Sequence, residues 1–487
     1  MWNGFFIYLS TDEKTNWKNQ TMMNPSAMTL QAYKLFHESV LAFARAEQQG
    51  IRIDVEYCER KKKQLTRKIT GLEKELQKAK LIQHWRHYYG KKFNMYSNWQ
   101  LAHILYDVKK ITPVSTTVTG KGSTDDEALS QLGIPELDSL LEIRKLIKVR
   151  DTYLDAFLRE QVNGILHPFF NLNTVRTYRS SSSNPNFQNI PKRDKEAMKI
   201  CRRAILPRPG HQLLEIDYSG IEVRIAACYH KDPNMIKYIK DPTTDMHLDM
   251  AKELFLLQFM DKKIPEHKVL RDATKNGFVF PQFYGDYYKN CAINMACGWG
   301  KLPKEGEWKA GQGISMPTGT LSDHFISMKI KSLYQYIEHV RKVEEDFWNN
   351  RFKVYQKWKN KWWVEYQRKG YLDMLTGFRC KGVMRKNEVL NTPIQGSAFH
   401  CLLWSFIEID KIMMKEKWKS RLIGQIHDAI VIDTHPSELE YVAKIVKQVT
   451  CHDLPKAWPW IIVPLDVEAD ICEVDQSWNK KFNYKLI

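Results

Sequence analysis

The chain has 487 residues, 43% of them hydrophobic and 27% charged, and its 74 Lys plus Arg against 56 Asp plus Glu give a net charge of +18. This composition excludes a disordered or fibrous chain. The length excludes a small binding module, because one hydrophobic core stops growing at roughly 250 to 300 residues, so we expect two or three lobes. The positive charge favours a polyanionic partner, while a basic protein that is merely soluble stays the alternative.

Residues 1–27 are polar and predict an N-terminal tail. From residue 30 to about residue 83 the apolar residues recur at helical spacing. The charged part of this region, residues 59–68, suits either a solvated helix face or contact with phosphates. Residues 357–363 combine Lys with Trp, which suits either DNA backbone contact or an amphipathic helix with a core-facing stripe.

Two polar segments interrupt the helical pattern of the first half. Residues 113–126 are rich in Thr, Gly and Ser, and they end in helix-capping chemistry at Ser123 or Thr124. Residues 173–192 carry Arg179, four consecutive serines and several amides. Such a donor-rich segment suits contacts with a nucleic-acid backbone or groove.

Runs typical of strands appear in two places. Residues 213–218 are apolar and close on an acid, Asp217, and residues 422–433 predict a hairpin with Asp428 at or near its turn. The region between them is mostly helical, apart from a Gly-rich and Pro-rich interruption at about residues 298–320.

The nine cysteines are odd in number, form no CxxC pair and are too sparse for a disulfide framework, so we expect reduced core residues. The apolar run Phe5 to Leu9 has no basic residue before it, unlike a signal peptide. No stretch approaches the ~18 uncharged apolar residues that a membrane helix requires. The sequence therefore predicts an intracellular, cytoplasmic protein with no membrane function.

Asp217 and Asp428 are far apart in the chain, so only a folded sheet brings them together. Two carboxylates at adjacent strand ends form a hard, oxygen-rich site suited to Mg²⁺. Taken singly, each aspartate is more often a turn or cap residue. The residues around them decide between these interpretations.

Arg271 and Lys275 are four residues apart, which places both cationic groups on one face of a helix, where they can hold a triphosphate. Downstream, Phe278, Phe280 and Tyr284 offer rings that can stack on a base. Such an aromatic stripe alone is more often part of a core. Beside Arg271 and Lys275 we expect it to contact a nucleotide.

Three motifs carry most of the information about function. They are Asp217-Tyr218-Ser219-Gly220-Ile221-Glu222-Val223-Arg224, then Arg271-x-x-x-Lys275 leading to Tyr284-Gly285, and last Gln425-Ile426-His427-Asp428. Further segments are Arg179-Ser180-Ser181, Asn184 to Pro191 and Asn391 to Ala398. In this order the segments resemble the family A DNA polymerases, over about residues 30–480.

The resemblance implies an α+β fold, a right-hand polymerase fold with an antiparallel-sheet palm, helical fingers and a helical thumb. The expected domains are an N-terminal tail (1–27), a connecting helix region (28–60), a thumb (61–150), a first part of the palm (151–230), fingers (231–368) and a second part of the palm (369–487). The implied activity is template-directed DNA synthesis, in which dNTPs are added to a primer 3′-hydroxyl by two-metal nucleotidyl transfer and pyrophosphate is released. The implied cofactor is Mg²⁺, two ions, with Mn²⁺ as a substitute.

The family's site residues carry over onto matching positions. Asp217, Asp428 and the Tyr218 backbone would hold the metal ions, and Lys275 joins the two aspartates in the catalytic set. The implied dNTP-binding residues are Arg271, Lys275, His247, Glu222, Phe280 and Tyr284. Glu222 would crowd the 2′ position of the sugar and so reject ribonucleotides. The implied DNA-binding residues are Arg179, Gln188, Asn391, Gln395, Gln425 and His427, whose donors can reach minor-groove acceptors present on every base pair.

The chain departs from the family pattern in the fingers helix, because Tyr284 follows Lys275 by nine residues where eight are usual. A one-residue π-bulge, or a kink at Pro281, would absorb the extra residue and leave Phe280 and Tyr284 aimed at the nucleotide. We therefore favour Phe280 over Phe278 as the stacking ring.

Three further positions differ from the family. Gly220 stands where a polar residue is usual, Asn387 where an Arg is common, and Ala429 where a Glu is usual. Arg385 lies two residues before Asn387 and is a substitute for the missing Arg. These changes concern primer contacts and a third carboxylate at the metal site, and they leave both Asp217 and Asp428 in place.

Only about 27 residues precede the first thumb-like helix, which is less than the ~50 residues of a small domain. We therefore expect no proofreading 3′ to 5′ exonuclease. The polymerase-only layout resembles bacteriophage members, for which the location would be the host cytoplasm. Expected partners are primer-template DNA, dNTP and a separate proofreading or replisome protein.

Two other functions stay open. A single-subunit RNA polymerase has the same fold and metals, but Glu222 argues against it because a 2′-hydroxyl would meet a carboxylate. A DNA-binding replication factor without catalysis is disfavoured because it has no use for Asp217 and Asp428 beside the pair Arg271 and Lys275.

Overall fold

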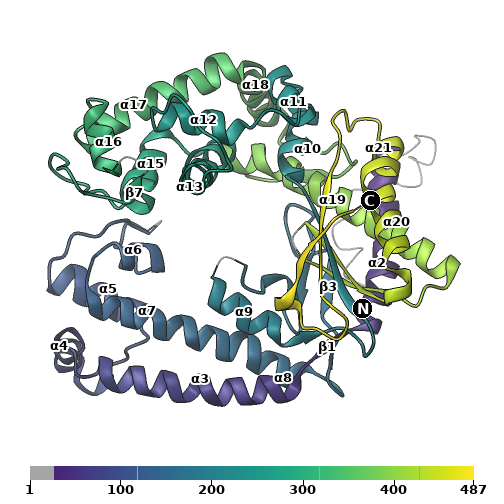
Figure 1. The fold of residues 1–487 in the computed structure, drawn as a ribbon, viewed down its shortest axis with the longest axis horizontal. Coiled ribbons are helices and arrows are strands. Elements are labelled where there is room, and N and C mark those ends of the chain that lie inside the picture. Colours follow the sequence, from purple (N-terminus) through teal and green to yellow (C-terminus); the bar gives the residue numbers. More distant parts are fainter. Residues whose placement is uncertain (1–26, 118, 193, 317–318, 427, 487) are drawn as a thin grey trace.

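A five-stranded antiparallel sheet forms the base from which two helical lobes extend to the same side (Figure 1). The structure is a computed structural model that describes residues 27–117, 119–192, 194–316, 319–426 and 428–486. The expected tail at residues 1–27 falls outside this range except for its last residue.

The sheet has the strand order β11-β12-β6-β13-β14. The strands are β6 (Gln212–Tyr218), β11 (Arg421–Ile426), β12 (Ala429–Thr434), β13 (Val467–Ile471) and β14 (Phe482–Tyr484). The two predicted strand regions therefore form the centre of the sheet, and the predicted hairpin is β11-β12.

Alternate residues of β6 belong to different cores, as the two-residue period of a strand requires. Leu214 and Ile216 pack with the helices on one face, among them α2 (Ala27–Gln49), α10 (Ile221–His230) and α19 (Lys386–Glu416). Leu213 faces the other way, into the core of the first helical lobe. The sheet is thus shared by two separately packed hydrophobic clusters.

Apart from the short 3-10 turn Gly90–Lys92, the first helical lobe contains eight helical segments among its described residues between 55 and 160. They are α3 (Val55–Leu76), α4 (Lys80–Tyr89), α5 (Asn98–Ala102), η2 (His103–Val108), α6 (Asp126–Ser130), α7 (Pro135–Ile147), η3 (Lys148–Asp155) and α8 (Ala156–Glu160). α9 (Lys195–Arg203) lies between this lobe and the sheet.

Two expectations for the first lobe were wrong. The helical pattern predicted from residue 30 to 83 is broken by β1 (Ile51–Ile53), which pairs with β2 (Ile165–Leu166) and β5 (Ile205–Leu206). A strand of three residues is too short to show a period. The cap of α6 is Asp125, whose carboxylate accepts the Ala128 N–H, and not Ser123 or Thr124. Asp is an equally good cap, so the sequence did not separate these neighbours.

The second helical lobe covers residues 233–369. Its segments are α11 (Pro233–Lys240), α12 (Met246–Leu254), α13 (Pro265–Thr274), η5 (Lys275–Val279), α14 (Phe280–Tyr284), α15 (Tyr288–Ile293), η6 (Asn294–Trp299), β7 (Ser315–Met316), β8 (Gly319–Thr320), α16 (Leu321–Ser327), α17 (Leu333–Asp346), η7 (Phe347–Arg351) and α18 (Lys353–Lys369). The predicted Gly-rich and Pro-rich interruption contains the short strands β7 and β8.

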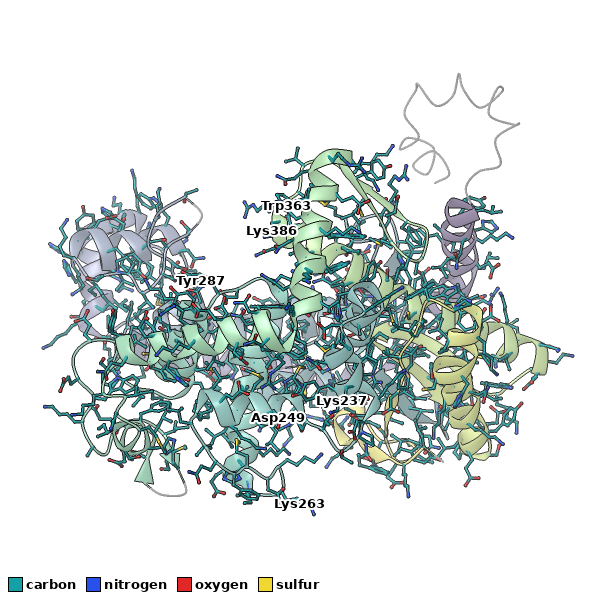
Figure 2. The ribbon with its side chains drawn as sticks, turned by 90° about the horizontal axis from the view of Figure 1, so that it is seen from above. Lys237, Asp249, Lys263, Tyr287, Trp363 and Lys386 are labelled. Carbon is teal, nitrogen blue, oxygen red and sulfur yellow. The ribbon has the colours of Figure 1, made fainter. Side chains whose placement is uncertain are left out.

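The Lys-rich and Trp-rich stretch lies within α18. Trp358 stacks on Trp362 with ring centroids 5.3 Å apart, and both rings pack near Tyr229 of α10. The tryptophans therefore face the core, and the exposed lysines lie on the outer side of the helix. Lys263 and Trp363 lie at opposite edges of this lobe (Figure 2).

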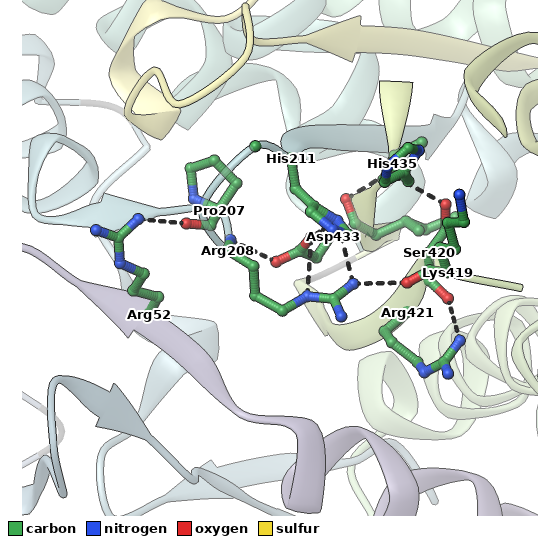
Figure 3. A network of polar contacts seen from close by, with 12 residues as sticks. Arg52, Pro207, Arg208, His211, Lys419, Ser420, Arg421, Asp433 and His435 are labelled. Atoms are coloured by element: carbon green, nitrogen blue, oxygen red, sulfur yellow. Dashed lines mark hydrogen bonds and ion pairs between the residues drawn. The ribbon is translucent and has the colours of Figure 1, made fainter. Parts of the chain in front are cut away.

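A polar network ties the start of β6 to the end of β12, remote from Asp217 (Figure 3). Asp433 accepts the Arg208 N–H at 2.8 Å and lies 2.8 Å from His211 Nδ1. Burial lowers the pKa of His211 in spite of this carboxylate. Arg208 also donates to the Lys419 carbonyl at 2.8 Å. The network fixes the far end of the sheet and so the strands that carry the acids.

Among the described residues, no helix has the length and apolarity needed to cross a bilayer. All nine cysteines are free and seven are buried, as expected for reduced core residues.

Candidate active site

The two aspartates meet at one edge of the sheet. Asp217 lies at the end of β6, and Asp428 lies in the turn between β11 and β12. The Tyr218 N–H donates to the Asp428 carbonyl at 3.2 Å, and Asp217 is directly opposite Ala429 in the strand register. Residues far apart in sequence are thus brought together by strand pairing.

Each acid is paired with a cation. Arg179 Nη2 lies 3.6 Å from Asp428 Oδ1, and Lys192 Nζ lies 3.5 Å from Asp217 Oδ2. The pKa of Asp428 is raised to about 6, mainly by burial and in part by the charges of Glu222 and Asp217, while Arg179 opposes the shift. Burial also raises the pKa of Asp217. The site therefore concentrates negative charge in a partly desolvated place.

Lys192 was not predicted as a site residue. It follows Pro191 at the end of the donor-rich segment, and no spacing rule links it to Asp217. In this structure it balances the Asp217 carboxylate from a neighbouring loop.

The residues fit a hard divalent cation. Mg²⁺ is commonly bound through one or two carboxylates together with substrate phosphates and waters. Asp217 and Asp428 supply such a pair. Among the described residues, no group of three or more His, Cys, Asp or Glu side chains is placed to hold a metal ion. With Ala429 at the third position, the site has two carboxylates.

A π-helical turn, η5, begins at Lys275 and absorbs the extra residue of the fingers helix. One of the two hypotheses for this insertion was a π-bulge, and the structure has it at Lys275–Val279. Pro281 follows at the start of α14, where its missing N–H costs no helical hydrogen bond. Phe280 and Tyr284 consequently face the same pocket.

Arg271 and Lys275 form a cationic group beside this pocket, and His247 lies next to them. The pKa of His247 is lowered to about 4, mainly by burial and in part by the charges of Arg271 and Lys275. Its Nδ1 is buried and has no partner among the described residues. Arg271 Nε donates to Asp245 at 2.8 Å, so part of its charge is already balanced.

The pocket lies between α10, α14 and α19. Its lining residues include Glu222, Phe280, Tyr284, Asn391 and Gln395. Tyr284 donates its hydroxyl to Glu222, and Arg179 Nη1 donates to the same carboxylate at 3.3 Å. Glu222 is therefore held in one position between a ring and a guanidinium.

Phe280 and Phe278 differ in environment. Phe280 lines the pocket, with Lys275 Nζ 5.4 Å from its ring centroid and the His247 ring 5.7 Å away. Phe278 is completely buried and packs edge-on against Phe347.

We predict that Phe280→Ala raises the KM for dNTP roughly tenfold, because stacking on a base is worth about 1–3 kcal/mol. Phe278→Ala should lower the melting temperature, since emptying a buried Phe site costs about 3–5 kcal/mol, and should leave KM unchanged. Steady-state kinetics and thermal melts of both variants separate the two. Weaker nucleotide binding in Phe278→Ala alone would reverse the assignment.

The predicted DNA-binding residues are only partly together. Asn391 Nδ2 donates to the Tyr284 carbonyl at 3.2 Å, and Gln395 lines the same pocket. Gln188 and Gln425 both donate to Ser180 Oγ, and Gln425 is buried with its Oε1 unpartnered among the described atoms. His427 lies outside the described residues.

Two departures from the family pattern have local causes. Gly220 precedes α10 with φ +60°, a left-handed conformation that favours glycine over a larger polar residue. The Asn387 side chain packs against Gly285. A Cβ added to Gly285 would lie only 2.4 Å from that side chain. Asn387 Nδ2 also donates to the Gly285 carbonyl at 3.3 Å.

The sequence model of DNA polymerase family A matches residues 55–297 and 331–480, which is most of the chain. The chain belongs to DNA polymerase family A. It is 28% identical over 449 residues to the thermostable DNA polymerase I of Thermus aquaticus, covering 88% of this chain and 46% of that protein. It is 27% identical over 425 residues to DNA polymerase I of Synechocystis sp., and this match covers 86% of this chain and 40% of that protein. The chain thus spans about half the length of the curated relatives it matches.

The fold agrees with a solved member of the family. The structure titled as the POL domain of Pol1 from M. smegmatis in complex with DNA primer-template and dNTP superposes with a TM-score of 0.69 at 25% identity, covering 91% of this chain and 70% of that chain. The expected right-hand polymerase fold, with an antiparallel sheet and two helical lobes, is confirmed. These relatives are bacterial, and a bacteriophage source stays a prediction.

Proposed function

We propose that this family A member is a DNA-directed DNA polymerase that adds dNTPs to a primer 3′-hydroxyl and releases pyrophosphate. The observation that carries the proposal is the convergence of Asp217 and Asp428 at one sheet edge, near a pocket whose Phe280 ring contacts Lys275 and His247. The partners are primer-template DNA and dNTP, which are also named for the M. smegmatis complex.

The domain boundaries expected from the sequence are part of this proposal. The sheet is the palm (151–230 and 369–487), the first helical lobe corresponds to the thumb (61–150), and the second to the fingers (231–368). Residues 28–60 connect the tail to the thumb, mainly through α2.

Asp217, Asp428 and the Tyr218 carbonyl hold the divalent ions, for which Mg²⁺ is proposed and Mn²⁺ is a substitute. When bound, the two ions lower the cost of forming the attacking 3′-alkoxide and neutralise the leaving pyrophosphate. The two aspartates are positioned for this by strand pairing, and Lys192 and Arg179 balance their charge before metal arrives.

The cationic group holds the triphosphate in line for attack. Lys275 and Arg271 contribute positive charge. His247 is neutral at pH 7 because of its low pKa, so it acts as a hydrogen-bond donor and not as a third cation. Arg271 must exchange at least part of its contact with Asp245 for phosphate.

The primer-template contacts are proposed for Arg179, Gln188, Asn391, Gln395, Gln425 and His427. Gln425 donates its side-chain N–H to Ser180 Oγ here, and it turns that N–H toward the minor groove to reach the acceptors that every base pair presents. Such contacts test base-pair geometry without reading sequence.

Glu222 excludes the 2′-hydroxyl. We predict that Glu222→Ala lowers the preference for dNTP over NTP roughly 10- to 100-fold, because crowding of the 2′-hydroxyl by the fixed Glu222 side chain costs about 1–3 kcal/mol. Comparing kcat/KM for dCTP and CTP measures this. Glu222→Gln is the matched control, since it keeps the volume and removes the charge. An unchanged preference in Glu222→Ala would contradict the role.

The proposed function is tested by extending a primer on a DNA template with dNTPs or NTPs in the presence of Mg²⁺. Efficient extension with dNTPs supports it. Efficient use of NTPs would indicate an RNA polymerase, and DNA binding without extension a non-catalytic factor. A bacteriophage source and a separate proofreading or replisome partner belong to the same proposal and rest on family resemblance.

A further inference from the structure

The family match is interrupted at residues 298–330. We call the described stretch 298–316 the arm. It leaves the second helical lobe after η6 and returns as β7. Since the family pattern does not require this segment, its contacts are informative about this particular chain.

The arm is firmly anchored. Leu302 and Trp308 are each only 3% exposed. The Trp308 backbone N–H donates to the Lys331 carbonyl at 2.6 Å, its indole donates to the Pro303 carbonyl at 2.9 Å, and its ring stacks on Phe325 at 5.6 Å. The exposed tip between these anchors, which includes Lys304, is therefore held in place.

The tip of the arm touches the first helical lobe. Lys304 Nζ donates to Gln131 Oε1 at 2.9 Å, across 173 positions of sequence. Gln131 directly follows α6, which is fixed by its Asp125 cap and by buried Leu129. In Figure 1, α6 and β7 face each other at the ends of the lobes remote from the sheet. We call the Lys304 to Gln131 contact the inter-lobe bridge.

The inter-lobe bridge joins two bodies that pack separately. Leu302 and Trp308 belong to the core of the sheet and second lobe, while Leu129 belongs to the core of the first lobe. Within the described parts of the chain, it is the one hydrogen bond or ion pair linking the two helical lobes. It is polar and exposed, so it can open without disturbing either core.

The bridge closes a ring of contacts. The sheet joins the two lobes at one end through its shared cores, and the bridge joins them at the other. Exposed lysines occur in both segments that the bridge joins, Lys301, Lys304 and Lys309 on the arm, which also carries Glu305 and Glu307, and Lys121 before α6. Phosphates between the lobes would draw these lysines inward, because polyanion binding is driven by charge neutralisation and ion release.

We propose that the arm and the tip of the first lobe close around bound nucleic acid, so that the protein stays on its primer-template through successive additions. This inference rests on the proposed function. The open bridge admits the duplex, and the closed bridge holds it by topology and not by sequence contacts.

The direct test is topological. Lys304→Cys with Gln131→Cys is loaded on a primed circular single strand and joined with a short bifunctional thiol reagent. The expected product resists high salt and is released when the circle is cut. The single-cysteine variants are controls for the native thiols, of which Cys297 and Cys451 are partly exposed. Equal salt release of double and single variants would overturn the proposal.

A charge swap tests the same contact without cross-linking. Gln131→Lys places like charge opposite Lys304 and should shorten the tract added per binding event at least about threefold, because like charges in contact oppose closing. Adding Lys304→Glu to the Gln131→Lys variant should restore the tract length, because opposite charges then face each other. The rate of single-nucleotide addition should stay unchanged in both variants. If Gln131→Lys leaves the tract length unchanged while single-nucleotide addition is normal, the bridge is refuted. If the wild type adds no nucleotide at all, the proposed function is refuted instead.

Discussion

Asp428→Asn is expected to reduce primer extension at least about 10³-fold, because the metal ions proposed to bind Asp428 would supply several kcal/mol of transition-state stabilisation. The carboxylate lies beside Asp217 at the sheet edge, and an amide binds a hard cation poorly. Single-turnover extension at saturating DNA and dNTP measures the loss. Asp217→Asn should behave alike, and both variants should bind primer-template within a few-fold of the wild type.

The pKa of Asp428 adds a second readout. Because burial raises this pKa to about 6, the wild-type carboxyl loses its charge as pH falls through 6, instead of near its ordinary value. Mn²⁺ affinity of the wild type should therefore fall below pH 6, and Asp428→Asn should lack this inflection. Because the pKa of Asp428 is higher in the folded than in the unfolded protein, ionising this carboxyl lowers the free energy of unfolding, and the full cost is present above pH 6. The variant should thus melt no lower than the wild type at pH 7, which shows that it folds.

Two results would contradict the proposed role of Asp428. Extension by Asp428→Asn within a few-fold of the wild type would place the chemistry elsewhere. A metal affinity that is independent of both aspartates would do the same.

Lys275→Ala is expected to lower kcat roughly 10²- to 10³-fold, the usual cost of removing one preorganised donor from developing charge. Lys275 lies near His247 and 5.4 Å from the Phe280 ring centroid, at the first residue of the π-helical turn. Rapid-quench measurement of one addition gives the rate of this step. The Lys275 charge lowers the pKa of His247 to its value of about 4 together with burial. In Lys275→Ala this pKa should therefore be higher than in the wild type, which NMR titration measures.

Lys263→Ala is the matched control, because Lys263 is an exposed lysine just before α13, at a remote edge of the lobe (Figure 2). It should leave both kcat and the His247 pKa unchanged. Equal effects of the two substitutions would mean that Lys275 acts only through general charge.

The central part of the site could be predicted from the sequence because it depends on local patterns. The apolar runs that end at Asp217 and Asp428 specify strands, and strand pairing alone brings the acids together. The extra residue before Tyr284 had to be absorbed by the helix, and the π-helical turn at Lys275 is one of the two ways foreseen.

Other features depend on tertiary contacts that leave no periodic trace. Lys192 reaches Asp217 from a loop, and Arg271 is held by Asp245 from another helix. The inter-lobe bridge of Lys304 and Gln131 joins exposed residues that each look ordinary in sequence. Short strands such as β1 are equally hard to foresee, because three residues define no period.

The most direct test of the account is single-nucleotide addition on four templates that differ only in the base opposite the next position. The account predicts that each template selects its complementary dNTP, that Mg²⁺ is required, and that Asp428→Asn removes addition on all four. Addition that ignores the template base, or that persists in Asp428→Asn, would contradict it.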